Sequence, residues 1–506
     1  MKDTDKGYAR IKSVTMKNFR NIEYGKVKFA NGDLESFYEG ASSITGIYGQ
    51  NGSGKTAVLL AISILGKLLR GEQLTASNLI KAGCESANLC YEISIYDDSY
   101  NRYNVVYSFD IFYDELSKAQ MLMEEDSLEE GSANKKDVTA AIVKNETIEY
   151  DGLACGGKRL RHKVLFSTIE EYCAEGTKPF GTQKGATRDA AYQAIVSNEL
   201  LRAKLLTRRE DALIAGKSFF FYVSDEKAAR RASYSWSVPD LLLPNILDEH
   251  DKAVYAWLSM FGYYIIVNMI AENGLVSLNR LPLTLFDVSQ AYALKRPLLK
   301  LDEEFTMTKK GVDDFARHIK RIGDVLSQLI PGVEIRLKIV GEYNTSVDAD
   351  AVKMRCELVT VRDGYELPLK EESNGIKRII SFATVFIAAY NNPFVTFAID
   401  EFDAGIYEDL LGKLAIIFEE SGKGQMIFTS HNLRPLEVLD WKSIVFTTTN
   451  PQNRFDQLPK AKTNNLRDQY LRIIKQGGAK ENFYNNPDEY ELELKLALSG
   501  EDGVSE

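Results

Sequence analysis

Apolar and polar residues alternate in several parts of the chain, and this alternation predicts antiparallel strands. Residues 89–96 and 103–112 show the alternation most regularly, as half-buried strands do. Further strand-like segments cover residues 9–16, 26–29 and 142–150. The first 150 residues are therefore expected to build an antiparallel sheet.

Continuously apolar runs predict buried elements instead. Residues 43–48, 394–399 and 426–430 have the length and composition of buried strands. The run from residue 255 to residue 270 spans 16 residues, fewer than the roughly 20 that cross a membrane. We expect it to form a buried core helix and not a membrane span.

Helices are predicted where apolar residues recur at helical spacing. The first begins after Thr56 and ends near Arg70, where Gly71 can terminate it. Further helices are expected at residues 188–213, 313–329, 379–390 and 464–472. Residues 114–136, rich in Glu, Lys, Ser and Gly, are expected to form a solvated loop.

Composition places the chain among ordinary globular proteins. It has 506 residues, 44% of them hydrophobic and 26% charged, which suits two to four structural units. The net charge of −10 gives no global attraction to nucleic acid. Solvated helix faces explain the basic clusters at residues 202–209 and 227–231 more often than nucleic-acid contacts do, so a local DNA contact stays open. Five cysteines without a C-x-x-C pair give no zinc signature and suit a reducing compartment. Because the first residues are charged and lack an apolar signal core, we expect a cytoplasmic protein without a membrane partner.

The strongest chemical signal is a glycine-rich turn between a predicted strand and a predicted helix. It matches G-x-x-x-x-G-K-[ST] and consists of Gly49, Gln50, Asn51, Gly52, Ser53, Gly54, Lys55 and Thr56. Glycines allow backbone N–H groups to point at phosphates, and the following helix presents its positive end to the same anion. Lys55 can reach the β- and γ-phosphates, and the Thr56 hydroxyl can ligate Mg²⁺. We therefore predict a site for ATP and Mg²⁺.

Two acids at the end of a buried strand are the candidates for metal binding and base catalysis. Residues 394–399 lead directly into Asp400 and Glu401. Beside the P-loop strand, Asp400 would lie near Mg²⁺, and Glu401 would orient or deprotonate the attacking water. Asp97 and Asp98 are a rival pair, closer to the P-loop in sequence. Their strand alternates and is not continuously apolar, so we assign them to an exposed turn.

Two further motifs suggest phosphate contacts. His431 follows the strand at 426–430 and could touch the γ-phosphate or the attacking water, although a lone histidine at a strand end is usually structural. Ser373, Asn374 and Gly375 begin an apolar helix and make a second anion site. One γ-phosphate does not need two such helix starts in one polypeptide. We therefore expect a homodimer or higher oligomer whose copies lie head to tail around the nucleotide.

The order of these motifs resembles the ABC-type ATPase head shared by the SMC, RecF and OLD families. Residues 18–22, Asn-Phe-Arg-Asn-Ile, are similar to the stretch that opens those heads. The resemblance implies an α/β fold of the P-loop NTPase class with an antiparallel β-subdomain and a helical insertion. It also implies that residues 373–375 form the signature motif, that Asp403 lies in the D-loop and that His431 is the switch histidine. The signature departs from the family's Ser-Gly-Gly-Gln, and the Q-loop glutamine cannot be placed.

This resemblance divides the chain into four segments. Residues 1–150 would form the first half of the head, with the P-loop and the β-subdomain, and residues 151–330 a mostly helical insertion. Residues 331–450 would form the second half, with the signature, the Walker B acids and the switch histidine. Residues 451–506 would form a helical tail.

The same resemblance implies an enzyme that hydrolyses ATP to ADP and phosphate. No acid cluster suited to a two-metal nuclease follows Glu401. A stand-alone head whose insertion is short compared with an SMC arm is similar to the ATPase subunits of anti-phage systems such as PARIS and Septu, which act with a separate nuclease or effector. A RecF-like ATPase that binds DNA in repair or chromosome maintenance is the alternative. The cytosolic subunit of an ABC transporter is disfavoured because the insertion is large.

Overall fold

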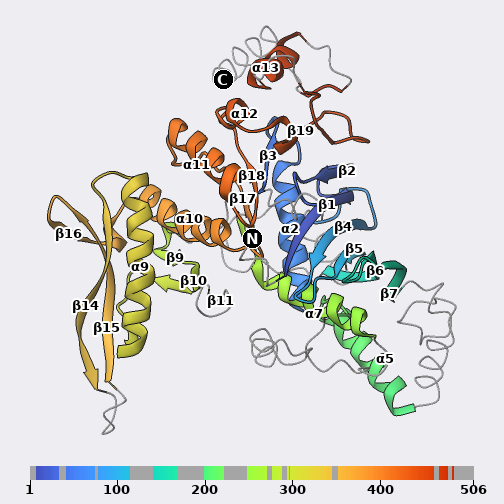
Figure 1. Cartoon of the computed structure of the whole chain (residues 1–506), viewed down its shortest axis with the longest axis horizontal. Helices are drawn as coiled ribbons and strands as arrows, with labels where there is room; N and C mark the ends of the chain where they lie inside the picture. The colour runs from blue at the N-terminus through green and yellow to red at the C-terminus, as the bar shows by residue number, and fades with distance from the viewer. Residues whose placement is uncertain are drawn as a thin grey trace, which may run out of the picture.

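The computed structural model shows two sheets with helices around them and a separate lobe at one side (Figure 1). It describes residues 7–33, 42–74, 78–113, 141–168, 199–221, 248–269, 276–287, 293–295, 297–344, 352–460, 466–476 and 481–483. The loop predicted at 114–136 lies outside these residues.

The first sheet is antiparallel throughout, as the alternating pattern predicts. Its strand order is β2-β1-β4-β5-β6-β7. The strands are β1 (Tyr8–Phe19), β2 (Ile22–Lys28), β4 (Ala87–Tyr96), β5 (Arg102–Tyr113), β6 (Ala141–Leu153) and β7 (Arg159–Ser167). Every second residue of β5 from Tyr103 to Ile111 is buried, so one face of this sheet covers the core.

The second sheet is mostly parallel and has the order β20-β19-β3-β18-β17-β8. Its strands are β3 (Ser43–Tyr48), β8 (Ile265–Asn268), β17 (Thr396–Ile399), β18 (Gln425–Thr429), β19 (Ile444–Thr447) and the antiparallel β20 (Phe455–Asp456). Every residue of β3, β17 and β18 is buried, as their continuous apolar character predicts. Because these three strands are parallel, the turns that follow them lie at one edge of the sheet.

Helix α2 (Lys55–Leu69) lies between the two sheets, beside α7 (Glu249–Tyr264) (Figure 1). Its apolar residues share one core with the antiparallel sheet and α7. A second core lies on the other face of the parallel sheet. It is covered by α10 (Asn374–Asn391), α11 (Glu408–Ser421), α12 (Pro435–Val438) and α13 (Leu466–Gln476). The outlying helix α5 (Glu199–Ile214) occupies part of the helix predicted at 188–213.

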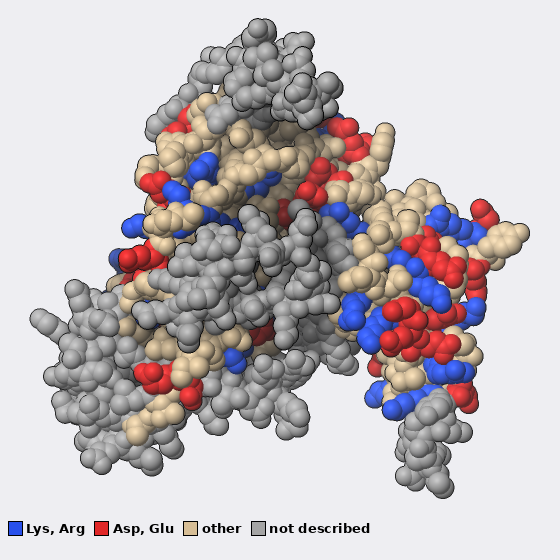
Figure 2. Space-filling model, turned by 180° about the vertical axis from the view of Figure 1, so that it is seen from behind, with Lys and Arg blue, Asp and Glu red and all other residues tan. Residues whose placement is uncertain are grey.

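A lobe beside α10 forms the third unit. Strands β13 (Phe305–Thr308), β14 (Glu334–Asn344), β15 (Val352–Arg362) and β16 (Tyr365–Pro368) make an antiparallel sheet, and α9 (Lys309–Leu329) covers one face of it. Two short ladders, β9 (Arg280–Pro282) with β12 (Leu298–Lys300) and β10 (Leu285–Asp287) with β11 (Ala293–Lys295), connect it to α10. Charges of both signs are interspersed over this lobe (Figure 2), with ion pairs such as Lys338–Glu366 at 2.8 Å. Mixed charge of this kind is typical of a solvated face.

Three sequence-based expectations need correction. The run at 255–270 is not a single helix, because α7 ends at Tyr264 and the chain continues as β8 beside β17. Ile265, Ile266 and Val267 are β-branched and complete the edge of the parallel sheet, which favours a strand. The domain boundary predicted at residue 150 falls inside β6. The domain boundary predicted at residue 330 falls inside the lobe, between α9 and β14, although α9 packs against β14. No helix of the described residues is long and apolar enough to span a membrane.

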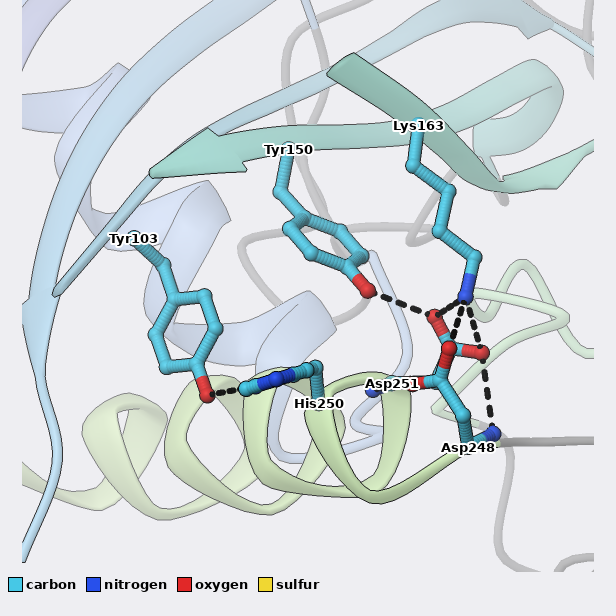
Figure 3. Close-up of polar contacts among 6 residues, drawn as sticks. All are labelled: Tyr103, Tyr150, Lys163, Asp248, His250 and Asp251. Atoms are coloured by element: carbon cyan, nitrogen blue, oxygen red, sulfur yellow. Dashed lines mark hydrogen bonds and ion pairs between the residues drawn. The ribbon is translucent and has the colours of Figure 1, made fainter. Parts of the chain in front are cut away.

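A polar cluster fixes the start of α7 to the antiparallel sheet (Figure 3). Lys163 on β7 places its ammonium 2.6 Å from a carboxylate oxygen of Asp248 and 2.6 Å from one of Asp251. The Tyr150 hydroxyl donates to Asp251 at 2.8 Å, and Asp251 is only 1% exposed. A carboxylate this deeply buried depends on its cation, so we interpret the cluster as the anchor of α7.

Lys163→Met is expected to lower the free energy of unfolding by about 3 kcal/mol, because it leaves the Asp251 carboxylate buried without its cation. Urea unfolding of the purified chain measures this loss. Lys252→Met is the matched control on α7, since Lys252 pairs at 2.9 Å with the exposed Glu249, and such surface pairs contribute roughly 0–1 kcal/mol. Equal losses in the two variants would contradict the anchoring role.

Candidate functional site

The glycine-rich turn wraps around the start of α2 with a backbone that requires glycine. Gly49, Gly52 and Gly54 have φ angles of 148°, 72° and 103°, a region that side chains other than glycine rarely adopt. At Gly49 a Cβ would also lie 1.7 Å from the Thr447 hydroxyl oxygen. No side chain of the described residues caps the start of α2. The first N–H groups of the helix are therefore directed at the turn, where they suit an anion.

Lys55 is held inside this turn. Its ammonium donates hydrogen bonds to the carbonyl oxygens of Gly49, at 2.7 Å, and of Gln50, at 3.0 Å. Burial lowers the pKa of the Lys55 ammonium from its usual value, while the carboxylates of Asp400 and Glu401 act in the opposite direction. The charge is therefore poorly hydrated and preorganised for a phosphate.

Thr56 and Asp400 face each other across the edge of the parallel sheet. The Thr56 hydroxyl oxygen lies 3.2 Å from the nearer Asp400 carboxylate oxygen. The buried Asp400 carboxylate also accepts a hydrogen bond from the Thr429 hydroxyl at 2.6 Å. A hydroxyl and a carboxylate are oxygen ligands of the kind that Mg²⁺ uses beside substrate phosphates. Among the described residues, no group of three or more His, Cys, Asp or Glu side chains could hold a metal ion by itself.

Glu401 follows Asp400 in a strained conformation. Its φ angle is 51°, which is uncommon for a residue with a side chain. The Glu401 N–H donates to the Thr429 hydroxyl oxygen at 2.9 Å, and its carbonyl accepts from Arg378 at 3.1 Å. Both contacts fix the backbone and leave the carboxylate available for chemistry.

Residues 51–56 of the P-loop, the two acids and His431 line one cavity of ≈ 1000 Å³. His431 is exposed, and its backbone N–H donates to the Asp403 carboxylate at 3.3 Å. Asp403 thus connects the predicted D-loop to the predicted switch histidine. The structure brings together residues that the sequence separates by more than 300 positions, including Thr56 and Asp400.

Part of the cavity lining was not assigned to the site from the sequence. These lining residues include Arg20, Asn21, Asn78, Ile80, Lys81, Ala82, Gly83, Cys84 and Tyr113. The Arg20 N–H donates to the Leu79 carbonyl at 2.8 Å, and the Asn21 amide donates to the Gly52 carbonyl. The Asn21 bond joins the 18–22 stretch to the P-loop, and the Arg20 bond joins it to Leu79, beside the lining residues Asn78 and Ile80. In the sequence, residues 18–22 were the available signal for this part of the cavity. They indicated a resemblance to a family but did not predict a contact with the P-loop.

The predicted signature residues lie elsewhere. Ser373 caps α10, because its hydroxyl accepts the Ile376 N–H at 3.4 Å, and Asn374 donates to the Ser277 hydroxyl at 3.3 Å. Ser373, Asn374 and Gly375 are all exposed, and none lines the cavity. The structure therefore does not join this helix start to the P-loop of the same chain.

The rival acids lie in the predicted turn, but Asp97 is buried, with 2% of its surface exposed, and Asp98 alone of the pair is exposed as expected. Asp97 accepts hydrogen bonds from the Ser99 and Asn101 N–H groups and from the Tyr103 hydroxyl. Neither Asp97 nor Asp98 lines the cavity. Asp97 is thus committed to the turn between β4 and β5.

Comparison with known proteins gives one family and several solved structures. The RecF/RecN/SMC N terminal domain model matches residues 10–453, a range that includes every residue of the candidate site. A Pyrococcus yayanosii Smc head domain with a coiled coil and joint is 14% identical with a TM-score of 0.39, covering 92% of this chain and 100% of that chain. The SMC head domain from Thermotoga maritima is 13% identical (TM-score 0.32; 89% and 99% covered). The recombination mediator protein RecF with ATP is 12% identical (TM-score 0.34; 89% and 100% covered). No curated protein matches the chain.

Proposed function

The chain belongs to the RecF/RecN/SMC N-terminal domain family, and from this premise we propose that it binds ATP with Mg²⁺ and hydrolyses the ATP. Its fold is that of the SMC/RecF ATPase head, a mixed α/β structure with an antiparallel sheet. The observation that carries the proposal is the single cavity in which Lys55 and Thr56 face Asp400 and Glu401. Release of phosphate from ATP by the purified chain tests it.

Each group has a distinct part in this proposal. Lys55 and the start of α2 bind the β- and γ-phosphates, and Thr56 with Asp400 would hold Mg²⁺, which neutralises charge on the phosphates. Glu401 accepts a proton from the attacking water. The water oxygen bonds to the γ-phosphorus while the bond from that phosphorus to the β-phosphate oxygen breaks, giving ADP and phosphate. His431, at the cavity wall, is placed to contact the γ-phosphate.

We place Ser373 and Gly375 on the ATP held by another copy of the chain. Their helix start is exposed and lies outside the cavity of its own chain. A second helix start facing the γ-phosphate would add donors where negative charge develops. The proposed working form is therefore a homodimer or higher oligomer with composite ATP sites.

Mixing Lys55→Ala with Gly375→Arg is expected to restore ATPase activity that neither variant has alone. A Cβ at Gly375 would meet only the Ser373 hydroxyl oxygen, at 3.9 Å, so this variant keeps its fold. Half of randomly paired dimers are mixed and each has one intact composite site, so up to about a quarter of the wild-type rate should return. Phosphate release from the mixture measures the recovery. A Gly375→Arg homo-oligomer with full activity would exclude the role across the interface.

For the biological role we propose a sensor or scaffold that controls a separate effector, for example a nuclease in anti-phage defence. The support is the resemblance of this head, with an insertion shorter than an SMC arm, to the ATPase subunits of such systems. The alternative is a RecF- or SMC-like ATPase that binds DNA directly, and family membership supports it at least as well. ATP hydrolysis stimulated by duplex DNA without a partner would favour the alternative. Co-purification with a nuclease encoded by the neighbouring gene would favour the effector role.

A further inference from the structure

Arg378 connects the helix that begins at Ser373 to the strand end that carries Glu401. It lies one turn inside α10, four residues after Asn374. Its guanidinium donates to the Glu401 carbonyl oxygen at 3.1 Å and lies 3.5 Å from that of Asp400. Burial lowers the pKa of Arg378, while the carboxylate of Glu401 acts against this change. The half-buried guanidinium is therefore stabilised by its contacts with the carbonyl oxygens of Asp400 and Glu401.

This contact matters because the backbone of Glu401 is strained. A φ of 51° places Glu401 in the left-handed region, which persists only where neighbouring groups hold it. Thr429 holds the N–H side, and the carbonyl side is held by Arg378 and by the Ala404 N–H, at 2.9 Å. Arg378 is the side chain among these carbonyl contacts, and without it this restraint is lost and the direction of the Glu401 carboxylate is less well defined.

The neighbouring basic residue on α10 has a different task. Lys377 donates to the Asn279 side-chain oxygen at 2.8 Å and to the Lys370 carbonyl at 2.7 Å. Lys377 thus joins the first turn of α10 to the lobe, and Arg378 joins the same turn to the parallel sheet. The contact to Glu401 is specific to Arg378 and is not a general effect of positive charge on this helix.

We propose that Arg378 is a positioning residue for ATP hydrolysis: it holds Glu401 of its own chain in the reactive conformation. This inference depends on the proposed ATPase function. Helix α10 would then carry residues with two roles. Ser373 and Gly375 would contact the ATP of the other copy, and Arg378 would position Glu401 in its own chain.

Arg378→Met is expected to lower kcat about 10- to 100-fold, because a misdirected base loses most of its contribution. The dissociation constant for ATP should stay within about twofold of wild type, since Arg378 does not line the cavity. Arg378→Lys keeps a charge and a donor and should recover part of kcat. Arg317→Met on α9 is the matched control, because Arg317 is exposed and contacts the Asp314 carboxylate and the Asp313 carbonyl, both on its own helix. An unchanged kcat in Arg378→Met, or ATP affinity lost in proportion to kcat, would overturn the proposal.

In the mixed dimers, Arg378→Met can be introduced into one copy at a time. The working site uses the P-loop and Glu401 of the Gly375→Arg copy, and only the helix start of the Lys55→Ala copy. Adding Arg378→Met to the Gly375→Arg copy should remove the recovered activity, and adding it to the Lys55→Ala copy should not. The reverse result, or loss in both arrangements, would overturn the own-chain role. If wild type does not hydrolyse ATP, the proposed function fails instead. If wild type hydrolyses ATP but mixing Lys55→Ala with Gly375→Arg restores no activity, the proposal of a composite site is wrong. The effect of Arg378→Met on kcat then still tests the role of Arg378.

Discussion

Lys55→Ala is expected to abolish ATP binding by the folded chain. The ammonium of Lys55 lies within the turn, 2.7 Å from the Gly49 carbonyl oxygen, where it can move onto a phosphate without leaving the loop. Its burial means that little water competes for the charge. A charge-assisted bond lost here costs about 3 kcal/mol, which is more than a 100-fold weaker dissociation constant.

Titration with a fluorescent ATP analogue measures this loss directly. Lys67→Ala is the matched control, because it makes the same change on the same helix α2, in the last turn. The control should bind with wild-type affinity, and both variants should keep the wild-type thermal midpoint. Unchanged affinity in folded Lys55→Ala would contradict the assignment of this turn as the nucleotide site.

The sequence predicted those parts of the fold that depend on local patterns. Alternation along β4 and β5 is a local signal and identified the antiparallel sheet, and continuous apolar runs identified β3, β17 and β18. The break between α7 and β8 was missed because both halves are equally apolar. The β-branched residues 265–267 favour a strand, but pairing with β17 is what ends the helix there. The lobe was missed because β13 pairs with β15 across the domain boundary that was predicted at residue 330.

The candidate site follows the same division. The P-loop and the strand ending in Asp400 and Glu401 are local motifs, and their meeting follows from the parallel sheet. Arg378 was missed because it acts on a backbone carbonyl 23 residues away, which leaves no pattern of residue types. The strained backbone of Glu401 could not be predicted from the sequence either, because its φ angle is set by the folded structure.

Glu401→Gln is expected to retain ATP and to stop hydrolysis. Glutamine has the size of glutamate, and the hydrogen bonds that hold this position use the backbone, to Thr429 and from Arg378 and Ala404. The substitution therefore removes the basic oxygen and leaves the turn unchanged. Loss of a general base costs roughly 10²- to 10⁴-fold in rate. Because ATP stays in place, the oligomer assembled around it should live longer than that of wild type.

Phosphate release gives the rate, and light scattering after gel filtration with ATP gives the lifetime of the assembly. Glu420→Gln serves as the matched control, since Glu420 is exposed on α11 and away from the cavity. The control should turn over ATP like wild type and dissociate at the same rate. If Glu401→Gln hydrolyses ATP at a near wild-type rate, another group accepts the proton. Asp97 would be a poor replacement, because its carboxylate is already engaged by the turn between β4 and β5.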